Sequence, residues 1–195
     1  MSGVRKGAAP TVGSPGTQPH ARPAWISSTA GTVAVDPHGS ATLDGSTNGA
    51  LLRSTDGGSS WKWIFLRKVG AVLGVLAIDP SDPQTLYASI GDASSRLRPA
   101  QLAKSIDGGK HWRSLKSGTH TIDATAVAIE PRDPNTMYAA TRFQGVLRTT
   151  DGGATWRPFN AGLLARAINT VTLDRTGGTL YAGTNGAGVV QIRLR

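Results

Sequence analysis

Short runs of β-forming apolar residues, separated by turn residues, recur along most of the chain. Two of them are TLYAS at Thr85 and TMYAA at Thr136, and they follow the Pro- and Asp-rich stretches DPSDPQ and EPRDPN. Proline fixes φ and aspartate bonds nearby amides, so such stretches are typical of tight turns between strands. The pattern predicts an all-β chain with almost no helix.

One strand motif recurs four times, as VAVDP, LAIDP, VAIEP and VTLDR, beginning at residues 33, 76, 127 and 171. Spacings of 43, 51 and 44 residues are typical of a four-stranded antiparallel propeller blade. We therefore expect a β-propeller, or a four-unit portion of one, over residues 23–195. Residues 1–22 are rich in Gly, Pro, Ser and Thr and are expected to be disordered.

An octapeptide closes three of the units, as STDGGSSW at Ser54, SIDGGKHW at Ser105 and TTDGGATW at Thr149. In a hairpin its Asp can accept amide hydrogen bonds across the turn, the Gly pair can adopt positive φ, and the Trp can cover the apolar side. Three equivalent copies cannot share one catalytic centre, so we assign them a structural role. The residues with this role are Ser54, Asp56, Gly58, Trp61, Ser105, Asp107, Gly109, Trp112, Thr149, Asp151, Gly153 and Trp156.

These octapeptides resemble the Asp-box, or BNR, motif of β-propellers, and the surrounding pattern is similar to bacterial Asp-box repeat proteins. Relatives of that family include sialidases, xyloglucanases, sortilin-type receptors and the photosystem II assembly propeller. The resemblance implies a propeller whose boxes lie at the blade periphery, away from the ligand-binding face. It also implies a secreted or cell-envelope location, although the N-terminus has no apolar signal-peptide core.

The fourth unit is shorter than the others. Leu194 stands where Asp151 stands in the third unit, so we expect neither a fourth octapeptide nor a fourth outer strand there. The open edge could be paired by PAWISST, Pro23 to Thr29, or the chain could be part of a longer propeller.

Composition and charge exclude several classes. The chain has no Cys, its four His lack ligand spacing, and we expect neither a metal site nor a cofactor. No apolar run is long enough to span a membrane. The net charge of +9 is spread along the chain, which makes nucleic acid an unlikely partner but leaves an acidic protein or carbohydrate open.

The catalytic candidates are weak. The single Glu, Glu130, occupies a turn position, so a sialidase would lack the Glu that pairs with its Tyr nucleophile. A xyloglucanase-like hydrolase needs two carboxylates facing one cleft, and outside turns and octapeptides only Asp44, Asp92 and Asp123 remain. Asp44 also stands where the other units have Tyr, and we interpret it as a solvated position in a degenerate edge unit.

The strongest ligand-binding candidates lie in an insertion of the second unit, Gly91 to Gln101. Insertions in repeat arrays commonly form variable binding surfaces, so Asp92, Arg96 and Arg98 are predicted to contact a ligand. A basic residue precedes three octapeptides, at Arg53, Lys104 and Arg148; it could line a channel, but we interpret it as part of a solvated strand face. We favour a non-catalytic binding or assembly module for a protein or carbohydrate; the alternative is a fragment of a secreted glycoside hydrolase.

Overall fold

The structure is a computed structural model, and it describes residues 30–37, 39, 41–47, 50–66, 71–92 and 100–194. Every regular element in this part of the chain is a β-strand. The all-β prediction is therefore confirmed. Within the same ranges, no helix is long and apolar enough to cross a membrane.

The described strands form five antiparallel sheets, and the four larger ones, in chain order, are here called blades 1 to 4. Blade 1 contains β1 (Ala30–Val35), β2 (Leu43–Thr47), β3 (Ala50–Ser54) and β4 (Lys62–Leu66). Blade 2 contains β5 (Ala71–Asp79), β6 (Asp82–Asp92), β7 (Gln101–Ser105) and β8 (Arg113–Ser114). Blade 3 contains β11 (Ala124–Ile129), β12 (Met137–Thr141), β13 (Val146–Thr149) and β14 (Arg157–Pro158).

Blade 4 has three described strands, β15 (Ile168–Leu173), β16 (Thr179–Thr184) and β17 (Val189–Arg193). A small hairpin of β9 (Lys116–Ser117) and β10 (His120–Thr121) connects blades 2 and 3. The predicted pairing segment, Pro23 to Thr29, lies outside the described residues.

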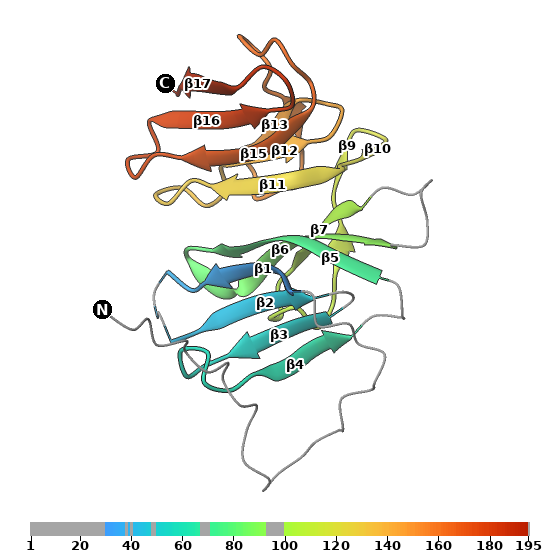
Figure 1. Cartoon of the computed structure of the whole chain (residues 1–195), viewed down its shortest axis with the longest axis vertical. Coiled ribbons are helices and arrows are strands. Elements are labelled where there is room, and N and C mark those ends of the chain that lie inside the picture. Colours follow the sequence, from blue (N-terminus) through green and yellow to red (C-terminus); the bar gives the residue numbers. More distant parts are fainter. Residues whose placement is uncertain are drawn as a thin grey trace, which may run out of the picture.

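The first strands of the blades are neighbours in chain order: β1 contacts β5, β5 contacts β11, and β11 contacts β15. Figure 1 shows blades 1 and 4 at opposite ends of this series. The four blades form an arc, which is a portion of a propeller. This agrees with the second form of the sequence-based prediction, a four-unit portion of a β-propeller.

Apolar side chains fill the space between successive blades. The face that packs on the preceding blade is here called the leading face, and the face that packs on the following blade the trailing face. Between blades 2 and 3, for example, Tyr87, Leu102 and Leu115 pack with Met137 and Trp156. Comparable clusters join blade 1 to blade 2 and blade 3 to blade 4.

Each blade has two ends, which differ in their connections. At the turn end, the turn between the first two strands meets the octapeptide turn, and in blade 3 the Gly152 amide bonds the Asn135 carbonyl. At the loop end, the connection between the second and third strands meets the connection from the preceding blade, as when the Arg142 amide bonds the Asp123 carbonyl. Function has to be sought separately at these two ends.

Candidate functional site

The octapeptide turns share one hydrogen-bond pattern. In blade 3, Asp151 Oδ1 accepts the Thr155 amide at 2.8 Å, Thr149 Oγ1 accepts the Gly153 amide at 3.1 Å, and Trp156 Nε1 donates to the Gly153 carbonyl at 3.2 Å. The same bonds occur in the other two turns, where the amides of Ser60 and His111 donate to Asp56 and Asp107. All six glycines of the pairs have φ between 66° and 92°. The expected turn chemistry is present in each copy.

The turn carboxylates are held in their ionised form by these bonds. The Ser60 hydroxyl, with amide donors, lowers the pKa of Asp56 to about 2, and the Thr155 hydroxyl does the same for Asp151. In the middle turn the His111 amide and ring lower the pKa of Asp107 below its usual range. Each carboxylate is committed to its own turn, which supports the structural role.

A second recurring interaction is a contact between a cation and a tyrosine ring, made by the second and third strands of a blade where they face the next blade. Tyr87 and Lys104 are opposite each other in the sheet, and Lys104 Nζ lies 5.3 Å from the centre of the Tyr87 ring. Lys104 Nζ also donates to the Gly152 carbonyl of blade 3 at 3.0 Å. Tyr138 and Arg148 repeat the ring contact in blade 3. These cations lie between blades, so the interpretation of a solvated strand face is wrong.

Asp44 takes the place of the tyrosine in blade 1. It is fully buried and receives two hydrogen bonds from Arg53, Nε to Oδ1 at 2.7 Å and Nη2 to Oδ2 at 2.8 Å. The interpretation of Asp44 as a solvated position is therefore wrong. The physical reason is the register: Arg53 stands directly opposite Asp44, so an ion pair replaces the cation–π contact. A carboxylate buried in this pair has no access to a substrate.

Asp123 lies at the loop end of blade 3, just before β11. It is largely buried, and its Oδ2 accepts a hydrogen bond from Arg142 Nε at 3.1 Å. Phe143 is next in the chain and 73% exposed. Gln144 Oε1 is buried and has no hydrogen-bond partner within the described ranges. The loop end of blade 3 therefore carries an ion pair and, next to Arg142 in the chain, an exposed aromatic residue.

Sequence reasoning proposed Asp123 but missed Arg142 and Phe143. The sequence contains a sign of them, because the third and fourth units differ at these two positions, where the fourth unit has Asn185 and Gly186. The two loops share hydrogen bonds: the Thr141 amide and Oγ1 donate to the Gly145 carbonyl, and the Thr184 amide and Oγ1 donate to the Gly188 carbonyl. These hydrogen bonds are thus shared, whereas the residues between them differ.

The insertion of blade 2 connects the end of β6 to the start of β7, and these two strand ends belong to the loop end. Asp92 is the last residue of β6 and is opposite Ala71. Arg96 and Arg98 lie outside the described residues, as does everything from 93 to 99. The assignment of Asp92, Arg96 and Arg98 to ligand binding stays a prediction.

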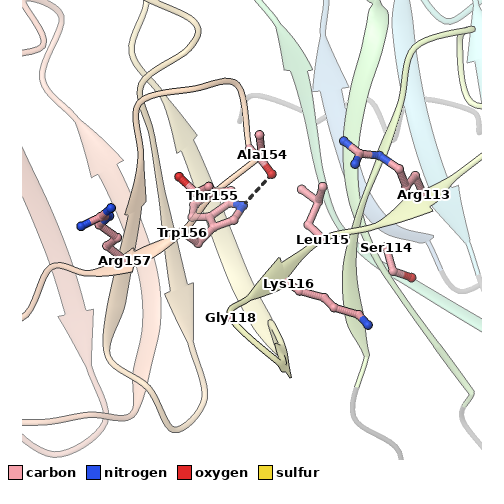
Figure 2. Close-up of a pocket in the computed structure, with 10 residues that line it drawn as sticks. Arg113, Ser114, Leu115, Lys116, Gly118, Ala154, Thr155, Trp156 and Arg157 are labelled. Atoms are coloured by element: carbon pink, nitrogen blue, oxygen red, sulfur yellow. Dashed lines mark hydrogen bonds between the residues drawn. The ribbon is translucent and has the colours of Figure 1, made fainter.

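A cleft of about 490 Å³ separates the outer parts of blades 2 and 3. Figure 2 shows Leu115 and Trp156 among the residues that line it, and Arg157 directed away from both. Its lining residues include Arg113, Lys116 and Arg157 but no acid. The volume is in the range of small-molecule sites, about 300–1,000 Å³, but these cations do not converge on one point.

Comparison with curated proteins finds xyloglucanases. A xyloglucanase of a Paenibacillus species is 28% identical over 172 residues, which is 72% of this chain and 16% of the relative. Xyloglucanase Xgh74A of Acetivibrio thermocellus is 30% identical over 139 residues, 56% of this chain and 16% of the relative. The chain thus spans 16% of the length of these relatives. No family model matches the chain.

Solved structures show the same kind of similarity. The GH74 enzyme of Niastella koreensis superposes with a TM-score of 0.68 at 20% identity, over 84% of this chain and 28% of that protein. The GH74 xyloglucanase of Xanthomonas campestris gives 0.59 at 21%, over 77% and 26%. YCF48 bound to a D1 peptide gives 0.61 at 13%, over 86% and 51%. At such identities the likeness establishes the fold, a partial β-propeller.

Proposed function

We propose that the chain binds a polysaccharide of the xyloglucan type at the loop end of blade 3, through Asp123, Arg142 and Phe143, and does not cleave it. The observation that carries the proposal is an exposed aromatic residue that follows, in the chain, the arginine of a carboxylate–guanidinium pair, in a chain similar in sequence to xyloglucanases. An aromatic face can stack on the apolar face of a sugar ring. The carboxylate accepts and the guanidinium donates hydrogen bonds to sugar hydroxyls.

The part of the proposal that excludes cleavage is based on the number of carboxylates at the loop end. Glycoside hydrolysis uses two carboxyl groups on either side of the scissile bond. Among the side chains that the structure describes at the loop end, Asp123 is the only carboxylate, and the other described acids serve turns or, like Asp44, are buried. A single carboxylate can hold a sugar but cannot supply both an acid and a base or nucleophile.

The octapeptide turns support the same assignment. Their hydrogen bonds agree with the resemblance to Asp-box repeats, in which the box is a peripheral structural element. Such turns stabilise the blades at the turn end and leave the loop end free to vary. The proposed site lies at that opposite end.

Hydrolysis is the second candidate function, because the curated relatives are xyloglucanases. Asp92 is the last residue of β6 and Asp123 precedes β11 on the adjacent blade, so these two aspartates are the pair that a test of hydrolysis has to change. Release of reducing sugar from xyloglucan by the purified chain, abolished separately by Asp92→Asn and Asp123→Asn, would establish hydrolysis. No release, together with binding, supports the proposal.

Calorimetric titration with xyloglucan oligosaccharides tests the binding itself. Phe143→Ala should weaken binding about tenfold, the equivalent of roughly 1.4 kcal/mol for a lost aromatic contact. Ile106 is equally exposed, 73%, but lies in an octapeptide at the turn end, so Ile106→Ala is the matched control and should bind as the wild type does. Equal affinity of all three proteins, or no binding by any, would overturn the proposal.

A further inference from the structure

The trailing face of blade 4 exposes a residue that every other blade buries. Leu51, Leu102 and Val146 occupy equivalent positions at or near the start of the third strand and are fully buried. The fourth copy of this position is Val189, and it is 73% exposed. Tyr181, which corresponds to the buried Tyr87, is likewise exposed. The face has the side chains of a blade–blade contact but no described blade against it.

The leading face of blade 1 is the complementary half of the same contact. Val33 and Val35 are 57% and 54% exposed, whereas their equivalents in blade 2, Leu76 and Ile78, are buried against blade 1. Trp61 is 39% exposed, whereas Trp156 is buried between blades 2 and 3. The difference arises because Trp61 has no described blade on its leading side.

We propose that the trailing face of blade 4 packs on the leading face of blade 1 in a second copy of this chain. Each chain carries both halves of the contact, and the contact already occurs three times within it, between successive blades. A head-to-tail contact of this kind closes if two copies each complete the other's arc. The resulting eight blades are within the range of about four to eight that propellers use.

The internal contacts also predict the polar part of the interface. Between blades 2 and 3, Tyr87 Oη and Lys104 Nζ both donate to the Gly152 carbonyl, at 3.4 and 3.0 Å. In the same register, Tyr181 and Gln191 of one copy face the Gly57 carbonyl of the other. Both side chains have a donor, so this carbonyl gains partners on association.

Sedimentation of the full chain over a range of concentrations tests the proposal. The mass should rise from 20.2 kDa for one chain to twice that value, and more readily at high salt because each copy has a net charge of +9. Val33→Glu and Val189→Glu should each keep the chain at the mass of one copy. A wild-type chain that stays at 20.2 kDa at every concentration would overturn the proposal.

Mixing the two variants tests the head-to-tail arrangement. Val33→Glu retains an intact trailing face and Val189→Glu an intact leading face, so an equimolar mixture should form two-copy complexes that neither variant forms alone. Ile106→Glu places the same charge at a residue that is also 73% exposed but lies on neither face, and it should associate as the wild type does. Circular dichroism confirms that each variant is folded. A mixture that remains at 20.2 kDa, or association lost equally in Ile106→Glu, would contradict the arrangement.

Discussion

The turn end and the loop end of the blades follow opposite rules. At the turn end, three blades repeat one set of hydrogen bonds around Asp56, Asp107 and Asp151. At the loop end, blades 3 and 4 share the hydrogen bonds of Thr141 to Gly145 and of Thr184 to Gly188, but they carry Arg142 and Phe143 in one case and Asn185 and Gly186 in the other. Repetition therefore marks what every blade needs to fold, and variation marks where one blade can acquire its own ligand.

The largest effect is expected at the paired residues on the second and third strands near the turn end. Blade 1 has the ion pair of Asp44 and Arg53 where blade 2 has Tyr87 and Lys104. Asp44→Ala would leave Arg53 buried without its partner, and Arg53 is 13% exposed in its side chain. Removal of one member of a buried ion pair typically costs about 3–5 kcal/mol. We expect a loss of this size in the free energy of unfolding, measured by denaturant titration.

A double variant provides the control for that loss. Asp44→Tyr with Arg53→Lys installs in blade 1 the pair that blade 2 uses, Tyr87 with Lys104. Most of the stability lost in Asp44→Ala should return, because a ring and an ammonium again face the next blade. A double variant no more stable than Asp44→Ala would show that the two pairs are not equivalent.

The next largest effect is expected in the octapeptide turn of blade 3. Thr149→Val keeps the shape of the side chain but removes the hydroxyl that accepts the buried Gly153 amide at 3.1 Å. An unsatisfied buried donor costs about 1–3 kcal/mol. Thr150 is exposed, and Thr150→Val should change the unfolding free energy by no more than about 0.5 kcal/mol. Equal losses in the two variants would disprove the role of the hydroxyl.

Acid should weaken the turn end selectively. The folded pKa of Asp56 and Asp151, about 2, is below the unfolded value of about 3.9. Stabilisation from such groups is complete above the unfolded pKa and is lost as pH falls toward the folded one. The unfolding free energy should therefore decrease between about pH 4 and about pH 2, and Ser60→Ala, which removes a donor to Asp56, should reduce the decrease. Stability that is constant over this interval would contradict the assignment.

Repetition made most of the fold predictable. The four copies of the strand motif fixed the number and order of the blades, and the octapeptides fixed their turns, because each copy confirms the reading of the others. Asp44 and Arg53 were misread because an isolated Asp in a strand is normally exposed, and only the register shows that Arg53 lies opposite it. Arg142 and Phe143 were missed because a unique residue in a shared loop has no second copy to draw attention to it.

The smallest effect on stability is expected at the loop end. The same residue also gives the most direct test of the claim that the turn end serves folding and the loop end serves binding. Phe143→Ala should change the free energy of unfolding by no more than about 0.5 kcal/mol, since the ring is exposed. Thr149→Val should lower that free energy but bind as the wild type does when folded. The decisive measurement is the affinity of these two folded variants for xyloglucan oligosaccharides. The account predicts that Phe143→Ala alone loses affinity; unchanged binding by Phe143→Ala, or an equal loss in Thr149→Val, would contradict the division of roles between the two ends.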